Sequence, residues 1–235
     1  MRKNMGLTIH YTLSLREELS AGVVRELVRR TGQFARKIGC AEVGGVLRAE
    51  KNGHLATHFF RVTEDFYSTA EPERGWLIQV RPAAGCETAR FGLCRYPRRI
   101  LLRDGFASTG IKGGWRLQAF CKTQYAGEHG WENFLKCHRM VISLLDFWRG
   151  LGVRVKVSDE GDFWESRSIE KLRRRFDSYN GLVAAMSGVL RDADSGLSIE
   201  SPIFDYQNFE RLEHEGWQEF GGRIKQLHEK LGGLK

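Results

Sequence analysis

Three consecutive stretches decide the fold: WRLQAFCKTQY (115–125), WENFLKCHRMVISLLDFWRGLG (131–152) and VRVKVSDEGDFWE (153–165). The first alternates apolar and polar side chains with the period of two that is typical of a strand. The second repeats apolar residues at helical spacing from about 131 to 150, and Gly152 ends it. The third opens with alternating valines. Together they predict a strand–helix–strand unit with polar groups at its ends.

One face of the strand over 115–125 is polar. Lys122 is a candidate for catalysis. The candidate ligand contacts on this strand and at its end are Arg116, Gln118, Gln124 and Tyr125. Two strands joined by a helix are usually parallel, so Tyr125 and Asp159 are expected at one edge if both strands share a sheet. Cationic and amide groups there suit phosphate oxygens and a base edge. The alternative is a strand that simply faces solvent.

Acidic residues follow the second strand of the unit. Asp159 and Glu160 are candidates for binding Mg²⁺, acting as a general base or accepting a ribose hydroxyl. Trp164 beside them is a candidate ligand contact. Acids at this place can equally cap the helix expected near Glu165, and capping is the expected role of Asp162.

Two histidines are candidates for catalysis. His138 shares a helix stripe with Phe134 and Val141, which predicts a buried histidine hydrogen-bonded to a strand or loop, although a catalytic base facing the sheet has the same pattern. His10 lies on the polar side of a predicted strand over 7–13, in the sequence IHYTL.

The segment from His10 to Leu13 resembles half of the paired HxT motif of two-histidine phosphoesterases. That resemblance implies a strand histidine beside a phosphate, working with a second histidine that transfers the other proton. The second copy is missing here, because neither His58 nor His138 is followed by a hydroxyl side chain two residues later. The family is therefore not indicated.

The rest of the chain predicts an α+β protein with a β-rich N-terminal half. A helix is expected over 15–38 with Ser14 as its cap, strands over 43–49, 56–62, 76–81 and 99–103, and long helices over 169–190 and 209–231. The expected domains are a basic α+β lobe over 1–103, a Gly-rich linker or loop over 104–114, and the strand–helix–strand unit with C-terminal helices over 115–235. One compact domain or two ferredoxin-like lobes also fit this order.

Composition narrows the class of protein. The chain of 235 residues is 41% hydrophobic, enough to bury a core, and holds no apolar run long enough for a membrane span. Its five cysteines form an odd set without zinc-like spacing, so buried thiols, a reducing compartment and a cytoplasmic location are expected. Phosphate-binding loops of the GxxxxGK[ST] type, GxSxG elbows and HExxH motifs are absent from the sequence.

The distribution of charge favours a phosphate-bearing partner. Residues 1–105 hold 18 Lys and Arg against 11 Asp and Glu, a net +7 of the total +8. Clustered positive charge attracts polyanions. The sequence therefore predicts a binding protein for nucleic acid or a nucleotide, in which Phe91 and Tyr96 stack on bases. The arginines expected to hold phosphates are Arg90, Arg95, Arg98, Arg99 and Arg103.

Two alternatives stay open. One is a phosphoesterase or nuclease, metal-assisted or dependent on histidine, and whether the protein is an enzyme is left undecided. The other is an interaction protein whose C-terminal helices dock a partner, which predicts an apolar patch on those helices.

Overall fold

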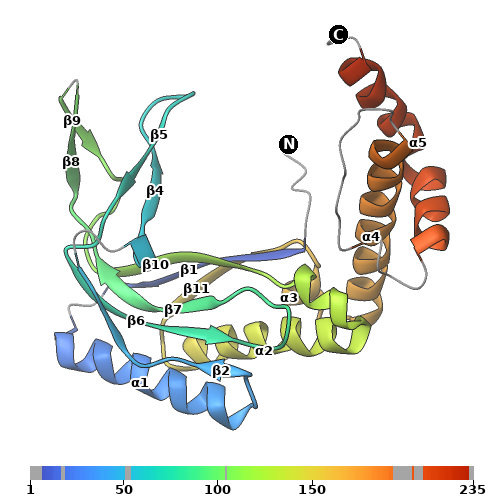
Figure 1. Ribbon diagram of the computed structural model, residues 1–235. Coiled ribbons are helices and arrows are strands. Elements are labelled where there is room, and N and C mark those ends of the chain that lie inside the picture. Colours follow the sequence, from blue (N-terminus) through green and yellow to red (C-terminus); the bar gives the residue numbers. More distant parts are fainter. Residues whose placement is uncertain are drawn as a thin grey trace. The chain divides into compact units, whose positions relative to one another are not determined.

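The computed structural model describes residues 7–16, 19–50, 54–103, 105–192, 203 and 209–232. They form an α+β structure with a β-rich N-terminal half and C-terminal helices, which confirms the predicted fold class (Figure 1). The described chain divides into two units. One covers Thr8–Ser158, and the other includes Leu7 together with Asp159 and the described residues that follow it.

A seven-stranded sheet forms the centre of the first unit. Its strand order is β11-β1-β10-β7-β6-β2, and β3 also pairs with β6. The strands are β1 (Thr8–Leu15), β2 (Glu42–Val43), β3 (Leu47–Ala49), β6 (Arg74–Arg81), β7 (Ala89–Arg95), β10 (Trp115–Lys122) and β11 (Arg154–Asp159). Two antiparallel hairpins are added to it: β4 (His58–Arg61) with β5 (Tyr67–Ala70), and β8 (Arg99–Leu102) with β9 (Gly105–Ser108).

The long pairing of β1 with β10 sets the two faces of the sheet. The strands run antiparallel from Thr8 opposite Lys122 to Leu15 opposite Trp115. Leu13 and Leu117 face each other and are fully buried, whereas the pair His10 and Phe120 is not. Because successive side chains point to opposite faces, one face is apolar and the other polar.

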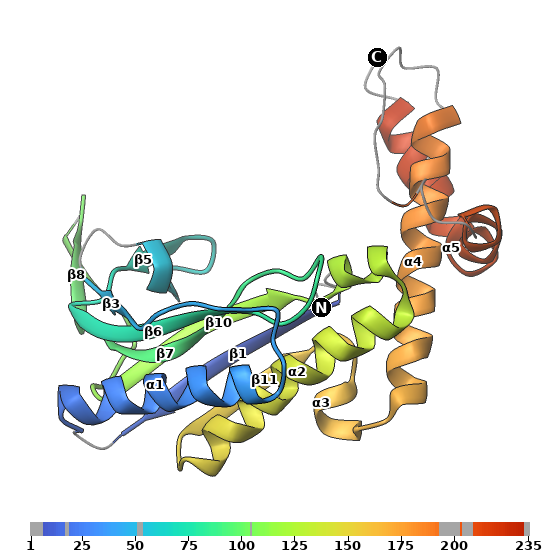
Figure 2. The same ribbon diagram turned by 60° about the horizontal axis from the view of Figure 1, so that its bottom comes forward.

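Helices α1 (Ala21–Lys37) and α2 (Trp131–Gly150) belong to the apolar side, whereas the hairpins β4–β5 and β8–β9 rise on the side away from α1 (Figures 1 and 2). In α1 the buried residues recur at helical spacing, among them Val24, Val28 and Ala35. Gly32 brings α1 close to β6, because a Cβ there would meet the Ile78 side chain.

The first helix begins later than its sequence pattern suggests. Ser14 and Leu15 pair with Arg116 and Trp115, so they belong to β1, and the predicted cap at Ser14 is wrong. The N-cap is Ser20, whose hydroxyl accepts from the Val23 amide at 3.4 Å. The predicted helix over 131–150 coincides with α2.

The central strand β7 was not predicted from the sequence. Two glycines mark its close approach to β6, since a Cβ at Gly92 would meet the Trp76 carbonyl oxygen and one at Gly75 would meet Cys94.

The structure also corrects the expectation that two aromatic residues in and after β7 stack on bases. Phe91 stacks on Tyr11 inside the core, and Tyr96 is buried with its hydroxyl donating to the Ala56 carbonyl at 2.7 Å.

The segment 104–114, expected as a linker or loop, contains β9, which pairs with β8. It lies inside the first unit, and the division of the chain falls between Ser158 and Asp159. Two ferredoxin-like lobes are not confirmed, because β1 and β10, the strands expected to open each lobe, are neighbours in one sheet.

The second unit is helical, as the sequence predicts. It contains α3 (Phe163–Ser166), α4 (Ile169–Asp192) and α5 (Phe209–Gly232). Gly181 and Gly216 let α4 and α5 approach closely, because a Cβ at Gly216 would meet the Gly181 carbonyl oxygen. Ala184, Phe209 and Leu212 belong to the small core of this unit.

The cysteines are partly as expected. Cys94 and Cys121 are buried thiols and Cys40 is a half-buried one. Cys86 and Cys137 form a disulfide, which corrects the expectation that all five cysteines are unpaired. The Cys121 Sγ lies 3.7 Å from that of Cys86, so three sulfur atoms gather beside the loop that precedes β7. Among the described residues, no helix combines the length and apolar character needed to cross a membrane.

Replacing Gly92 with alanine tests the close packing of β7 on β6. The new methyl group would collide with the backbone of Trp76 and Leu77, so Gly92→Ala is expected to lower the free energy of unfolding by about 1–3 kcal/mol in urea denaturation. Gly45→Ala is the matched control, because a Cβ there meets nothing within 4 Å. Equal midpoints for the two variants would contradict the packing described here.

Candidate binding cavity on the open sheet face

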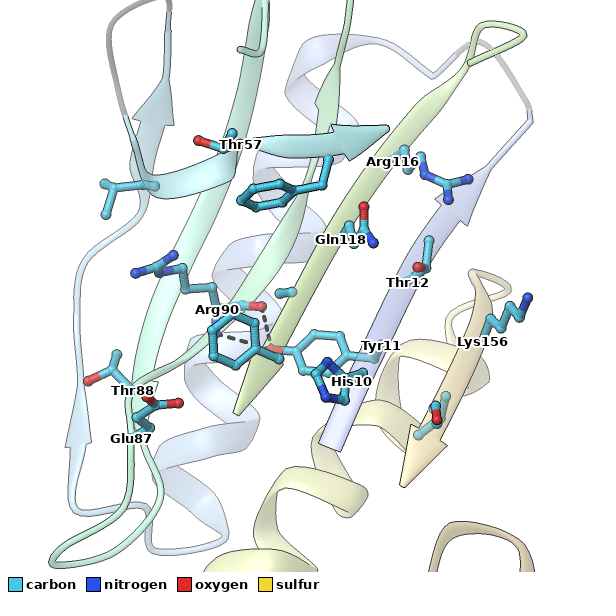
Figure 3. Close-up of a pocket in the computed structure, with 16 residues that line it drawn as sticks. His10, Tyr11, Thr12, Thr57, Glu87, Thr88, Arg90, Arg116, Gln118 and Lys156 are labelled. Carbon is cyan, nitrogen blue, oxygen red and sulfur yellow. Dashed lines mark hydrogen bonds between the residues drawn. The ribbon is translucent and has the colours of Figure 1, made fainter. Parts of the chain in front are cut away.

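A cavity of about 840 Å³ lies on the polar face of the sheet, in the first unit (Figure 3). Its floor comes from β1, β10 and β7, one side from β11, and the opposite wall from the segment around β4. The lining residues are His10, Tyr11, Thr12, Leu55, Thr57, Phe59, Glu87, Thr88, Arg90, Arg116, Gln118, Ala119, Phe120, Lys156, Val157 and Ser158. This volume lies in the range of small-molecule and cofactor sites.

The cavity reaches into the sheet where β7 and β10 are not paired. Arg116 opposite Cys94 is the one aligned pair of these strands among the described residues. Farther along, the Tyr11 hydroxyl takes the place of β10: it donates to the Arg90 carbonyl at 2.7 Å and accepts from the Arg90 amide at 3.2 Å (Figure 3). Ala119, opposite Tyr11 in the register, has only a methyl side chain. A single hydroxyl group thus satisfies the backbone of β7 at the floor of the cavity.

Burial keeps this hydroxyl protonated. Desolvation raises the pKa of Tyr11 well above its ordinary value, and the nearby Cys121 adds to the effect. The neutral phenol can therefore donate and accept at the same time, which its two bonds with Arg90 require.

The wall of the cavity is fixed by a buried contact. Leu55, Thr57 and Phe59 line it, and the Ala56 carbonyl between them accepts the bond from Tyr96. His58 in the same segment is buried, with its ring tilted against that of Tyr96 at 5.4 Å. The wall is therefore tied to the end of β7.

Three cations face this cavity without a carboxylate partner among the described residues: Arg90, Arg116 and Lys156. The Nε atoms of Arg90 and Arg116 are buried and have no hydrogen-bond partner. Burial also lowers the pKa of Arg116, which shows the cost of desolvating its charge. A buried guanidinium nitrogen without an acceptor is unfavourable, so an anion that reached these side chains would be stabilised there.

One acidic residue, Glu87, is part of the cavity lining. The Glu87 Oε2 accepts from the Lys122 backbone amide at 2.9 Å, which joins the start of β7 to the end of β10. Glu87 also lines the cavity, where its remaining acceptor capacity suits a ligand hydroxyl or amino group.

Two aromatic rings are exposed in the cavity. Phe59 is 60% exposed and Phe120 is 48% exposed, and the His10 ring lies 5.8 Å from that of Phe120. Because these phenyl rings are exposed on the sheet face and not packed in the core, they offer a flat surface to a planar ligand.

The structure brings four of the predicted residues together. His10, Arg116 and Gln118 line the cavity from the adjacent strands β1 and β10, and Arg90 lines it from β7. Neighbouring polar groups come from Thr12 and Ser158.

The other predicted residues of the first unit lie outside the cavity lining. Lys122 contacts Tyr125 at the end of β10, with 3.4 Å from Nζ to the hydroxyl, and Gln124 follows in the 3₁₀ helix η2 (Gln124–His129). His138 is fully buried in α2, and its Nδ1 lies 2.9 Å from the Thr123 hydroxyl. Arg95 lies over the Trp115 ring, whereas Arg98 and Arg99 are exposed before and in β8.

The predicted acids belong to the second unit. Asp159 accepts backbone bonds from Gly161, Phe163 and Trp164 at 2.8–2.9 Å, which is the capping role that the sequence left open. The Trp164 ring carries the Arg167 guanidinium at 4.7 Å, and Glu160 is half-buried beside Asp159. The expected proximity of Tyr125 and Asp159 at one edge of the sheet concerns residues of both units, and it stays a prediction. No cluster of three metal-binding side chains occurs among the described residues.

Sequence reasoning missed several cavity residues. Phe120 was available as a signal, because it is an apolar ring on the otherwise polar face of its strand. Lys156 alternates with valines in the same way. Arg90 was expected to hold phosphate, but its strand was not predicted, although Ala89, Phe91 and Leu93 alternate around it.

Comparison with known proteins adds no relative: no family model, curated protein or solved structure matches this chain. A function has to be inferred from the cavity itself.

Removing the Tyr11 hydroxyl tests its role at the sheet opening. Tyr11→Phe leaves the Arg90 amide and carbonyl without their partner, so the free energy of unfolding should fall by about 1–3 kcal/mol in urea. Tyr125→Phe is the control, since Tyr125 is exposed and its hydroxyl accepts a long hydrogen bond of 3.4 Å from the Lys122 ammonium. A loss of similar size in both variants would argue against the bridge.

The wall of the cavity should be sensitive to acid through His58. Burial, with the nearby Arg116 charge, lowers the pKa of His58 from 6.5 to about 4. The unfolded chain therefore binds more protons between those values, and stability falls as the pH drops through this window. From pH 7 to pH 5 the loss should be about 2 kcal/mol larger in the wild type than in His58→Gln, measured by urea denaturation. An NMR titration midpoint of the His58 ring near 6.5 would contradict this.

Proposed function

We propose that the open sheet face binds single-stranded nucleic acid. The observation that supports this best is the coexistence, in one cavity, of three cations without described carboxylate partners and two exposed aromatic rings, those of Phe59 and Phe120. Cations suit the phosphate backbone, and exposed rings suit unpaired bases.

A single strand fits these features better than a duplex. In a duplex the base faces are stacked on one another and unavailable to a protein ring, whereas unpaired bases can stack on aromatic side chains. Phe120 lies near the middle of a sheet face, between β1 and β7, where a base can lie flat against it. Gln118 beside it offers both a donor and an acceptor to a base edge.

The other functions considered from the sequence have less support. Of the five residues proposed for catalysis, His10 lines the cavity and the other four do not. Docking through the C-terminal helices predicts an exposed apolar patch on them. Among the described side chains of α4 and α5, the exposed large apolar residue is Ile169 alone, which does not make a patch. Both remain predictions without a specific observation in their favour.

Fluorescence anisotropy with labelled U12 and dT12 tests the proposal. Three phosphate contacts by Arg90, Arg116 and Lys156 imply a slope of about −2 for log K against log salt. Arg116→Met should weaken binding about tenfold and reduce the slope by about 0.7, because it keeps the aliphatic stem and removes the charge. Phe120→Ala should weaken binding with little change in slope, because it removes stacking alone.

Arg25→Met on α1 is the matched control for charge, since it lies on the helix that covers the other sheet face and should bind as the wild type does. A blunt 12-base-pair duplex should bind more weakly than U12. Saturable binding of UMP without binding of either oligomer would reject a nucleic-acid site, and gel analysis of the incubated U12 reports any strand cleavage.

A further inference from the structure

The β8–β9 ribbon, defined as Arg99–Leu102 with Gly105–Ser108, presents apolar side chains to solvent. Leu101 and Phe106 face each other across the two strands, and they are 71% and 73% exposed. These are the largest exposed fractions among the large apolar side chains of the described residues. Arg99, two residues before Leu101, lies on the same face of the ribbon.

The charge around the ribbon suits a polyanion. The sequence over 96–114 holds four basic residues, Arg98, Arg99, Arg103 and Lys112, and one acidic residue, Asp104. All four basic residues are exposed. Exposed apolar groups among positive charges match the unpaired bases and phosphates of a nucleic acid.

The base of the ribbon is held in place by hydrogen bonds. The hydroxyl of the buried residue Thr109 donates at 2.8 Å to the Pro97 carbonyl and lies 3.1 Å from that of Arg98. The Thr109 amide also donates to the Arg98 carbonyl at 3.0 Å. These hydrogen bonds join the two ends of the ribbon, so the orientation of its exposed face is fixed where it leaves the sheet.

The ribbon also belongs to the strands that line the cavity. It is inserted between β7 and β10, which contribute Arg90 and Phe120, and it rises from the sheet on the side away from α1 (Figures 1 and 2). We infer that the ribbon is a second contact surface for the strand bound in the cavity, with Leu101 and Phe106 against unpaired bases and Arg99 on phosphate. This inference rests on the proposed function, and it implies that the protein contacts a longer stretch of the nucleic-acid strand than the cavity alone can hold.

A length series of oligouridylates tests the inference. The wild type should bind more tightly as the oligomer grows from U2 to U12. In the double variant Leu101→Ser with Phe106→Ser, affinity for U12 should fall about tenfold or more, while affinity for the shortest oligomer that binds stays within twofold. Arg99→Gln should reduce the salt slope for U12 alone by about 0.7. Val23→Ser, an exposed apolar residue of α1, is the control for loss of surface hydrophobicity.

The outcomes separate this inference from the proposed function. Unchanged U12 binding by the double variant, together with a loss in Arg116→Met, would overturn the inference and leave the cavity proposal standing. An equal loss for all lengths would also overturn it, because the ribbon would then act on the cavity itself. If neither U12 nor dT12 binds the wild type, the proposed function fails first. Binding to phosphatidylglycerol vesicles that the double variant loses, without binding to U12, would assign the ribbon to a lipid surface instead.

Discussion

The hydroxyl group of Tyr11 holds strand β7 in place where β10 no longer pairs with it. A sheet that opens between two strands leaves backbone donors and acceptors facing a cavity, and such groups are costly unless they are paired. Here one phenol accepts from the amide of Arg90 and donates to its carbonyl. The opening can therefore persist, and it brings the Arg90 side chain, the Ala119 methyl group and the cavity floor together.

The two faces of the sheet differ in what they contribute to stability. Leu13, Leu117 and Phe91 lie in the apolar core, so that face contributes most of the hydrophobic stabilisation. The opposite face keeps cations, amides and exposed rings that contribute little to stability. Arg116 carries the cost of this arrangement, since its charge is partly desolvated and its Nε has no partner. Interactions left unmade in the free protein are available to a ligand.

Local patterns predicted much of the fold. The period of two in β1 and β10 and the apolar stripes of α2, α4 and α5 are strong signals, because each element buries one face. β7 was missed, since Gly92 and Cys94 give its second face no clear character, and only its partners show that the glycine allows close pairing. The cavity was harder still. Tyr11 and Arg90 are 79 residues apart, and the wall at Ala56 is fixed by Tyr96, 40 residues later. His10, Arg116 and Gln118 could be found because they stand on the polar faces of two predicted strands, but no local pattern shows that β1 and β10 are neighbours.

The pairing of β1 with β10 also bears on how the chain folds during synthesis. Leu15 pairs with Trp115 and Thr8 with Lys122, so every contact of this ladder joins residues at least 100 positions apart. Contacts of such high sequence separation form slowly, because a long loop must close before they stabilise the chain. The N-terminal strand leaves the ribosome long before its partner, with Ile9, Tyr11 and Leu13 unburied until then. The ladder of β1 can therefore form only after β10 has been made, and until then its apolar side chains are exposed to misassociation.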